Sequence, residues 1–304
     1  MLEHGIALQD LLNQRGDHDA RYALLVDLVR AAEEFGVTEL IVKLRLDLAT
    51  AARDCGRLGE ALGLAESAVS ALPRTELAKT AEHVRALGVL VSVKVDSGDT
   101  AEIDPLIDTM LALAESLSSP TVLGRSHWAA SIAYARLGRS DRTLHHISNA
   151  HRMLAHPDTS LRDWGRFARA AASALLDTDA ALDDIDTYIR WMRSAAELSD
   201  SPTDHAHTSL IEARYALRTG DAEQALALTE HEPVNLTTTD VIRHHLTHGQ
   251  AEHRLGRTAA AIGTLRAAAQ LAEQHSNYRL ATQIWREIDR VHTSAPVSAA
   301  DRES

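Results

Sequence analysis

A tight glycine turn between two helical patterns recurs along this chain and restricts it to a repeat fold. A further turn without glycine is predicted at residues 176–178, between the third and the fourth glycine turn. Successive turns lie about 36–43 residues apart, which is the period of stacked helical hairpins. Because each hairpin of such an array packs only on its neighbours, a long chain needs no single large core. The glycines of these turns are Gly56, Gly98, Gly138, Gly220 and Gly256.

Small residues recur at one position in the second helix of these hairpins. Ala61 follows the first glycine turn, and Ala225 and Ala261 follow two later turns at the same distance. Alternating small and large residues allow facing helices to interdigitate closely. Apolar residues make up 45% of the chain, proline is scarce, and runs of alternating valine and isoleucine are missing. This composition predicts an all-α fold.

The pattern predicts about seven helical hairpins followed by a capping helix. The cap is expected over residues 277–292, where Trp285 would cover the last hairpin. The end of the chain is poor in large apolar residues, so we predict a helical repeat domain over residues 1–293 and a disordered tail over residues 294–304. The hairpins are expected at residues 2–35, 38–72, 75–117, 121–154, 160–198, 203–230 and 240–275.

These features resemble the consensus of the tetratricopeptide repeat (TPR), in which a glycine ends the first helix and alanines seat the second. Pro73 stands where the TPR consensus closes a repeat with proline. The longer period and the closing sequence HSNYRLATQIWREIDRVH resemble the TPR-type sensor regions of actinobacterial helix-turn-helix regulators. Such regulators carry a DNA-binding segment before the repeats, for which this sequence offers no candidate. The resemblance implies a right-handed superhelix, an α-solenoid, with a role in regulation or sensing.

The charge and the cysteine content limit the partners and the compartment. A formal net charge of −12 opposes attraction of the whole surface to nucleic acid or to membranes. No segment has the roughly 20 consecutive apolar residues of a membrane span, and the N-terminal sequence lacks the features of a secretory signal. Cys55 is the single cysteine, so no internal disulfide can form. We therefore expect a cytoplasmic protein without direct contacts to nucleic acid or membranes.

The TPR resemblance places the first helix of each hairpin along an inner, concave groove. Counting back from each turn selects positions that are rich in arginine, with Asp54 and Asp96 as the acidic exceptions. Arginine offers a planar fork of donors that suits carboxylate or phosphate groups. The sequence leaves open whether these arginines only cover helix surfaces, and whether the aromatic candidates pack in the core. The candidate ligand-binding residues are Arg85, Arg125, Trp128, Arg136, Trp164, Phe167, His207, Arg214, Arg218, Arg243, Gln250 and Arg254.

His244 and His248 form the densest histidine pair and share one helix face, which suits two metal ligands. A catalytic zinc site needs a third protein ligand, and the HExxH pattern is missing. We therefore predict no metal and no cofactor, and we favour a non-catalytic module that binds a peptide, a protein segment or a small anionic ligand in the groove. Two alternatives stay open: a self-associating scaffold, for instance a homodimer, and a metal-dependent enzyme centred on the two histidines.

Overall fold

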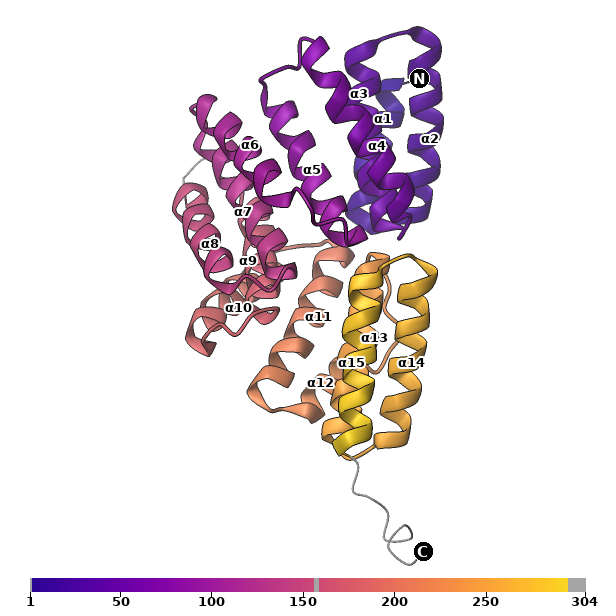
Figure 1. The fold of residues 1–304 in the computed structure, drawn as a ribbon, viewed down its shortest axis with the longest axis vertical. Helices are drawn as coiled ribbons and strands as arrows, with labels where there is room; N and C mark the ends of the chain where they lie inside the picture. The colour runs from indigo at the N-terminus through magenta and orange to yellow at the C-terminus, as the bar shows by residue number, and fades with distance from the viewer. Residues whose placement is uncertain (1, 156–158, 295–304) are drawn as a thin grey trace, which may run out of the picture.

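The computed structural model describes residues 2–155 and 159–294 and shows an array of antiparallel helical hairpins (Figure 1). These residues form fifteen α-helices along a curved path, with the short 3-10 helix η1 (Leu72–Arg74) between the second and third hairpins. The hairpins are α1 (Leu2–Arg15) with α2 (His18–Phe35), α3 (Thr38–Asp54) with α4 (Leu58–Ala71), α5 (Ala81–Ser97) with α6 (Ile103–Ser116), α7 (Pro120–Arg136) with α8 (Ser140–Leu154), α9 (Leu161–Leu176) with α10 (Leu182–Glu197), α11 (Pro202–Thr219) with α12 (Ala222–Leu228), and α13 (Thr238–Arg254) with α14 (Thr258–Gln274), followed by α15 (Tyr278–Ser294).

Short polar side chains fix the start of several of these helices. Ser160 precedes α9, and its Oγ accepts a hydrogen bond from the backbone N–H of Asp163 at 3.0 Å. Thr237 caps α13 in the same way, by accepting from the N–H of Asp240 at 3.2 Å. Each cap satisfies a donor that has no partner inside the helix. Pro120 begins α7, where its missing N–H costs no helical hydrogen bond.

The core runs along the array as a series of apolar clusters between neighbouring helices. Phe167 is the largest fully buried side chain in the cluster of α7 to α11. Ala61, Ala225 and Ala261 also expose 0% of their surface, so the recurring small residues lie inside the hairpins as expected. The predicted fold class, an all-α TPR-like solenoid of about seven hairpins, is confirmed.

The array curves back on itself, so that its last hairpins meet its first (Figure 1). The hydroxyl groups of Ser201 and Thr203, which begin α11, each donate to the backbone oxygen of Gln14 at 3.1 Å. A Cβ placed on Gly56, in the turn between α3 and α4, would meet the Nδ1 of His275 at 2.6 Å. In addition, α15 contacts α5. The helices therefore enclose a central space rather than an open groove.

Helix boundaries follow the prediction closely, with one exception and one part that stays open. The third hairpin begins with α5 at Ala81 and not at residue 75, because Pro73 and the turn held by Thr75 come first. The predicted capping helix is α15, and its Trp285 donates from Nε1 to Glu273 on α14 at 2.8 Å. Residues 295–304 of the predicted tail lie outside the described residues. Every helix of the described part is too short or too polar to cross a membrane.

Candidate ligand-binding cavity

The first helix of each hairpin faces a central cavity with two chambers. Their volumes are about 420 Å³ and about 700 Å³. Arg136, Asp177, Arg214 and Arg243 line both chambers and form their common wall. We call the smaller one the mixed chamber, because its lining from helices α1 to α13 carries both charges. The larger one, lined by the ends of α7 and α9 and by α11, α13 and α15, is the arginine chamber.

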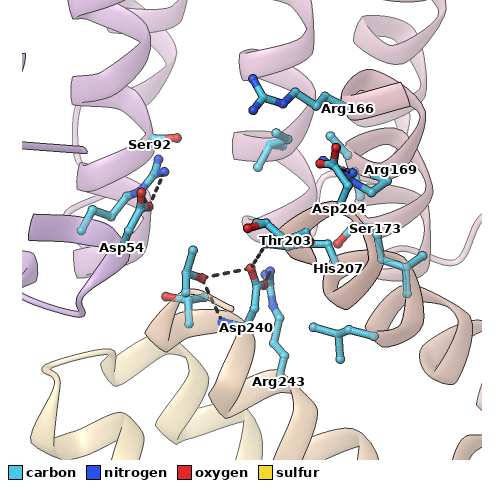
Figure 2. Close-up of a pocket in the computed structure, with 18 of the residues that line it drawn as sticks. Asp54, Ser92, Arg166, Arg169, Ser173, Thr203, Asp204, His207, Asp240 and Arg243 are labelled. Carbon is cyan, nitrogen blue, oxygen red and sulfur yellow. Dashed lines mark hydrogen bonds and ion pairs between the residues drawn. The ribbon is translucent and has the colours of Figure 1, made fainter. Parts of the chain in front are cut away.

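Figure 2 shows polar side chains on opposite walls of the mixed chamber. Asp54 and Ser92 come from α3 and α5 on one side, while Arg166 and Arg169 come from α9 on the other. The ring nitrogens of His18 and the Nε1 of Trp128 are buried without a hydrogen-bond partner among the described residues. The described lining carries seven arginines and five aspartates, and they are Arg21, Arg53, Asp54, Asp96, Arg136, Arg166, Arg169, Asp177, Asp204, Arg214, Asp240 and Arg243.

His207 and Asp240 form an ion pair that joins α11 to α13 in the wall of the mixed chamber. The Nε2 of His207 lies 3.2 Å from the Oδ2 of Asp240, and its Nδ1 lies 2.7 Å from the carbonyl oxygen of Thr203. Burial lowers the pKa of His207, but the hydrogen bond and the charge of Asp240 outweigh it, so that the pKa is raised. Burial likewise opposes ionisation of Asp240, yet His207 and Arg243 hold its pKa well below the usual range.

Several predicted groove arginines bind a carboxylate that lies about one repeat away in the sequence. The Nη1 of Arg136 on α7 lies 2.5 Å from the Oδ1 of Asp96 on α5. Arg214 on α11 pairs with Asp177 after α9 and also donates to the Oγ of Ser173 at 2.8 Å. These pairs are mostly buried, and each of them couples two consecutive hairpins because its two partners lie in different hairpins. Part of the arginine content of the cavity is therefore used to hold the array together.

The arginine chamber differs from the mixed chamber, because its described lining has eight arginines and one carboxylate, that of Asp177. Arg218 donates to the backbone oxygen of Ala180 at 3.1 Å, and Arg254 donates to that of Leu217. No ion pair with a described carboxylate holds Arg279 on α15, and its Nε and Nη2 are buried without a hydrogen-bond partner in this part of the chain. The arginines are Arg136, Arg214, Arg218, Arg243, Arg254, Arg279, Arg286 and Arg290.

Three of these guanidinium groups have a lowered pKa, whereas for Arg243 the charges of Asp177 and Asp240 outweigh the effect of burial and raise the pKa. Burial, together with the charges of Arg243 and Arg136, lowers the pKa of Arg279 to about 10. Burial also lowers the pKa of Arg136 and of Arg214, and in both cases Arg243 adds to the effect. A lowered pKa means that the site disfavours the charged form. With eight arginines and one carboxylate in its described lining, the arginine chamber is a concentrated positive field inside an acidic protein.

The structure brings most of the predicted ligand-binding residues to the cavity and places two of the arginines elsewhere. Arg85 pairs with Asp47 on α3 at 2.9 Å, and Arg125 pairs with Asp163 on α9 at 3.0 Å. Neither of these arginines is among the described residues that line the two chambers. Those that do line a chamber are Trp128, Arg136, His207, Arg214, Arg218, Arg243, Gln250 and Arg254.

The prediction for α9 needs a correction. Phe167 is fully buried in the core, and Trp164 packs in an aromatic cluster with its ring centroid 5.1 Å from that of Trp191. Within the described residues, α9 contributes Arg166, Arg169 and Ser173 to the cavity, which are shifted along the helix from the predicted positions. The turn after α9 has no glycine to mark it, so the count back from this turn started too early.

Other cavity residues were missed by the sequence prediction altogether. Asp204 and Asp240 lie at the beginnings of α11 and α13, before the positions that were counted from the turns. Arg279, Arg286 and Arg290 lie on α15, which was interpreted only as a cover for the last hairpin. Their spacing places these three arginines on one helix face, and this signal could have identified them.

The histidine pair and the cysteine lie outside this cavity lining. The Nδ1 of His248 lies 2.9 Å from the backbone oxygen of Thr229, and burial lowers the pKa of His244 to about 4. Across the described residues, no three histidine, cysteine or acidic side chains are grouped so that they could hold a metal ion. Burial, with Asp19 nearby, raises the pKa of the Cys55 thiol to about 12, which disfavours the reactive thiolate.

Comparisons with known proteins identify a fold but no family. No protein-family model matches the chain, and no curated protein matches it. A solved structure of a Rap protein complexed with competence and sporulation factor is similar over 90% of this chain and 71% of its own, with a TM-score of 0.57 and 15% sequence identity. The apo form of RapI covers 92% of this chain and 71% of its own at 13% identity, with a TM-score of 0.48. The first similarity shows a shared TPR-like helical fold.

Proposed function

We propose that this protein is a non-catalytic binding module that holds an anionic ligand inside its ring of helices. The ligand is a peptide, a protein segment or a small molecule that carries acidic groups. The observation that carries the proposal is the arginine chamber, where eight arginines face one carboxylate among the described lining residues, although the whole protein has a net charge of −12. Walls of low dielectric constant concentrate such a field and attract anions.

The neighbouring mixed chamber supplies the other contacts that a ligand of this kind needs. Trp128 offers an apolar face and an unpartnered Nε1–H donor, and Leu210 and Ile211 add apolar surface. Each of the two chambers has the volume of an ordinary ligand site. The Rap protein of similar fold is complexed with competence and sporulation factor, which supports a binding role for this fold.

A regulatory or sensing role in the cytoplasm belongs to the same proposal. It rests on the resemblance of the repeats to TPR-type sensor regions and on the single cysteine of the chain. We assign residues 1–293 to the binding module and residues 294–304 to a tail outside it.

Charge reversal of an arginine in the cavity tests this function. Arg214 is unsuitable, because it is buried against Asp177 and its reversal would damage the fold. Arg218 is more exposed and donates only to a backbone oxygen among its described contacts. We expect Arg218→Glu to weaken the binding of tetraglutamate about tenfold in calorimetric titrations at low salt.

Arg266 on the outer face of α14 is the matched control, because it is exposed and lies outside both chambers. Arg266→Glu should leave the affinity within about twofold of the wild type, and added salt should weaken binding to the wild type. Equal losses in the two variants would show that only the net charge matters, and binding in the cavity would then be wrong.

A further inference from the structure

We propose that the arginine chamber is a binding site for a phosphate-class group, a phosphate or a diphosphate, held between Arg136, Arg243 and Arg279. The inference rests on the proposed function and names the anionic group that it recognises. Arg136 comes from α7, Arg243 from α13 and Arg279 from α15, so that three separate helices bring these side chains to one place. Arg214 of α11 stands beside them in the same wall.

The unpartnered donors of this cluster indicate where the group would bind. The Nε of Arg136 and the Nε and Nη2 of Arg279 are buried, and none of them has a hydrogen-bond acceptor among the described residues. A buried donor without an acceptor destabilises the folded protein. These three N–H groups belong to two arginines that line the same chamber, and guanidinium forks match the geometry of phosphate oxygens.

The charges favour a dianion over a single carboxylate. Asp177 already contributes one carboxylate to the common wall, and Arg214 and Arg243 both bind it. This carboxylate nevertheless leaves Arg279 without an ion pair in the described structure, and the pKa of Arg279 stays lowered by burial and by its cationic neighbours. A second carboxylate would bring one negative charge and two oxygens. A phosphate group brings up to two charges and more acceptor oxygens, which suits three donors that come from two arginines on different helices.

Substitution of Arg279 distinguishes a ligand-binding role of this residue from a role in stabilising the fold. An arginine that stabilises the ligand-free fold should lower the melting temperature when it is removed. Arg279 is partly buried, and its Nε and Nη2 lie buried near Arg243 and Arg136 without a carboxylate in hydrogen-bonding contact among the described residues. Replacing it with a neutral residue should therefore leave the melting temperature of the free protein unchanged or higher, while the binding of the anion is lost.

The test titrates the full chain with inorganic diphosphate, inorganic phosphate and acetate at equal ionic strength, by calorimetry and thermal unfolding. We expect diphosphate and phosphate to bind and to raise the melting temperature, and acetate to have little effect. Arg279→Gln should weaken the binding of diphosphate about 10- to 100-fold, the loss expected when a charged donor group is removed. The control Arg266→Gln removes an exposed arginine of α14 outside the chamber and should bind as the wild type does.

A second variant covers the case in which Arg279→Gln does not fold. Arg279→Lys keeps the positive charge but lacks the Nε donor and the planar fork, so it should also weaken diphosphate binding by several-fold. Three results would overturn the inference: no stabilisation by diphosphate, equal stabilisation by acetate, or an equal loss of affinity in Arg266→Gln. If tetraglutamate still binds in a manner that depends on Arg218 while diphosphate does not, the proposed function stands and this inference falls.

Further titrations determine which kind of molecule carries the phosphate group. A phosphoserine peptide is compared with its unphosphorylated form, and adenosine diphosphate is compared with adenosine. Preference for the phosphopeptide would identify a modified protein segment as the ligand, and preference for the nucleotide would identify a small molecule. Either result supports the phosphate site, whereas binding of the unphosphorylated peptide and of adenosine with undiminished affinity would contradict it.

Discussion

Arginine has two different roles in this cavity, and a nearby carboxylate decides between them. Arg214 binds Asp177, the residue that follows α9, and so ties α11 to the preceding hairpin. Arg279 has no such partner among the described residues, and the charges of its neighbours lower its pKa. The same residue type therefore joins hairpins at one position and creates an unbalanced positive charge at another. The first role stabilises the fold, and the second supplies the site with free donors.

The ion pair of His207 and Asp240 predicts a specific dependence of stability on pH. The pKa of His207 is raised in the folded protein by Asp240, against the effect of burial. Its contribution is thus fully present below the ordinary histidine pKa of 6.5 and is lost as the pH rises through the raised pKa. Asp240 has a lowered pKa, so its own contribution is lost only in strong acid. We expect His207→Gln to reduce the free energy of unfolding by about 1–3 kcal/mol at pH 6 and by less at pH 9.

Urea unfolding of the wild type and the variant at pH 6, 7 and 9 measures this difference. Arg169 and His18 also act on His207, and His18 has a lowered pKa because of burial. Burial of a neutral histidine gives the opposite slope with pH. The comparison should therefore be repeated in a His18→Gln background. A difference between wild type and variant that stays constant from pH 6 to pH 9 would show that His207 is not charged in the folded protein.

The sequence predicts which residues face the cavity, but it does not predict their contacts with other hairpins. The positions of Arg136, Arg214 and Arg243 on the inner face follow from the spacing to the next turn, which is local information in the sequence. Their partners are not local, because Asp177 binds both Arg214 and Arg243 across different hairpins. Which arginine keeps a free charge depends on these long-range contacts, so it could not be deduced from the sequence.

Among the helices, α4 gives the sharpest test of how the hairpins pack. Ala61 is fully buried where α4 meets Ala52 of α3 and Val93 of α5. Gly63 lies on the same helix, and a Cβ added there would meet nothing within 4 Å. We expect Ala61→Leu to destabilise the protein by about 1–3 kcal/mol through overpacking. Gly63→Ala should instead stabilise it by about 0.5–1 kcal/mol, because alanine has the higher helix propensity.

Chemical denaturation of the two variants beside the wild type provides both values. The two changes in the free energy of unfolding should have opposite signs. Two substitutions in one helix would then distinguish the effect of close packing from the effect of helix propensity. An unchanged free energy of unfolding in Ala61→Leu would mean that the small residues at this position are not required for the contact between the helices.

The boundaries of most helices were predictable, because the chemistry that sets them is local. Glycine turns and capping residues such as Ser160 and Thr237 mark helix ends within a few positions. The turn after α9 lacks glycine, and there the predicted register placed Phe167 in the groove although it belongs to the core. Periodicity alone does not distinguish a core aromatic residue from one that lines a cavity, since both lie on an inward face of the helix.

At the scale of the whole molecule, closure of the array turns a groove into an enclosed cavity. The contact between the end of α1 and the start of α11 joins hairpins that are far apart in the sequence (Figure 1). No local sequence pattern indicates such a contact, so the sequence predicted a superhelix with a concave groove and gave no sign of its closure. Closure also explains why α15 contributes to the cavity, because it contacts α5 across the ring. A ligand held between Arg136 of α7 and Arg279 of α15 would bridge distant parts of this ring.

Substitution of two glycines that flank α2 distinguishes the effect of ring closure on stability from the effect of local backbone strain. Gly16 and Gly36 have φ angles of 70° and 69°, so alanine is strained at both positions by a similar amount, roughly 1 kcal/mol. A Cβ at Gly36 would meet nothing within 4 Å, whereas at Gly16 it would lie 2.7 Å from the Oγ1 of Thr203 and 2.9 Å from the Cα of Asn235. We therefore expect Gly16→Ala to cost about 1–3 kcal/mol more than Gly36→Ala in denaturant unfolding, because only Gly16 touches a distant hairpin. Small-angle X-ray scattering should show a larger radius of gyration for Gly16→Ala alone, as the ring opens. Equal stabilities and equal radii for the two variants would mean that the contact at Gly16 does not hold the ring closed in solution.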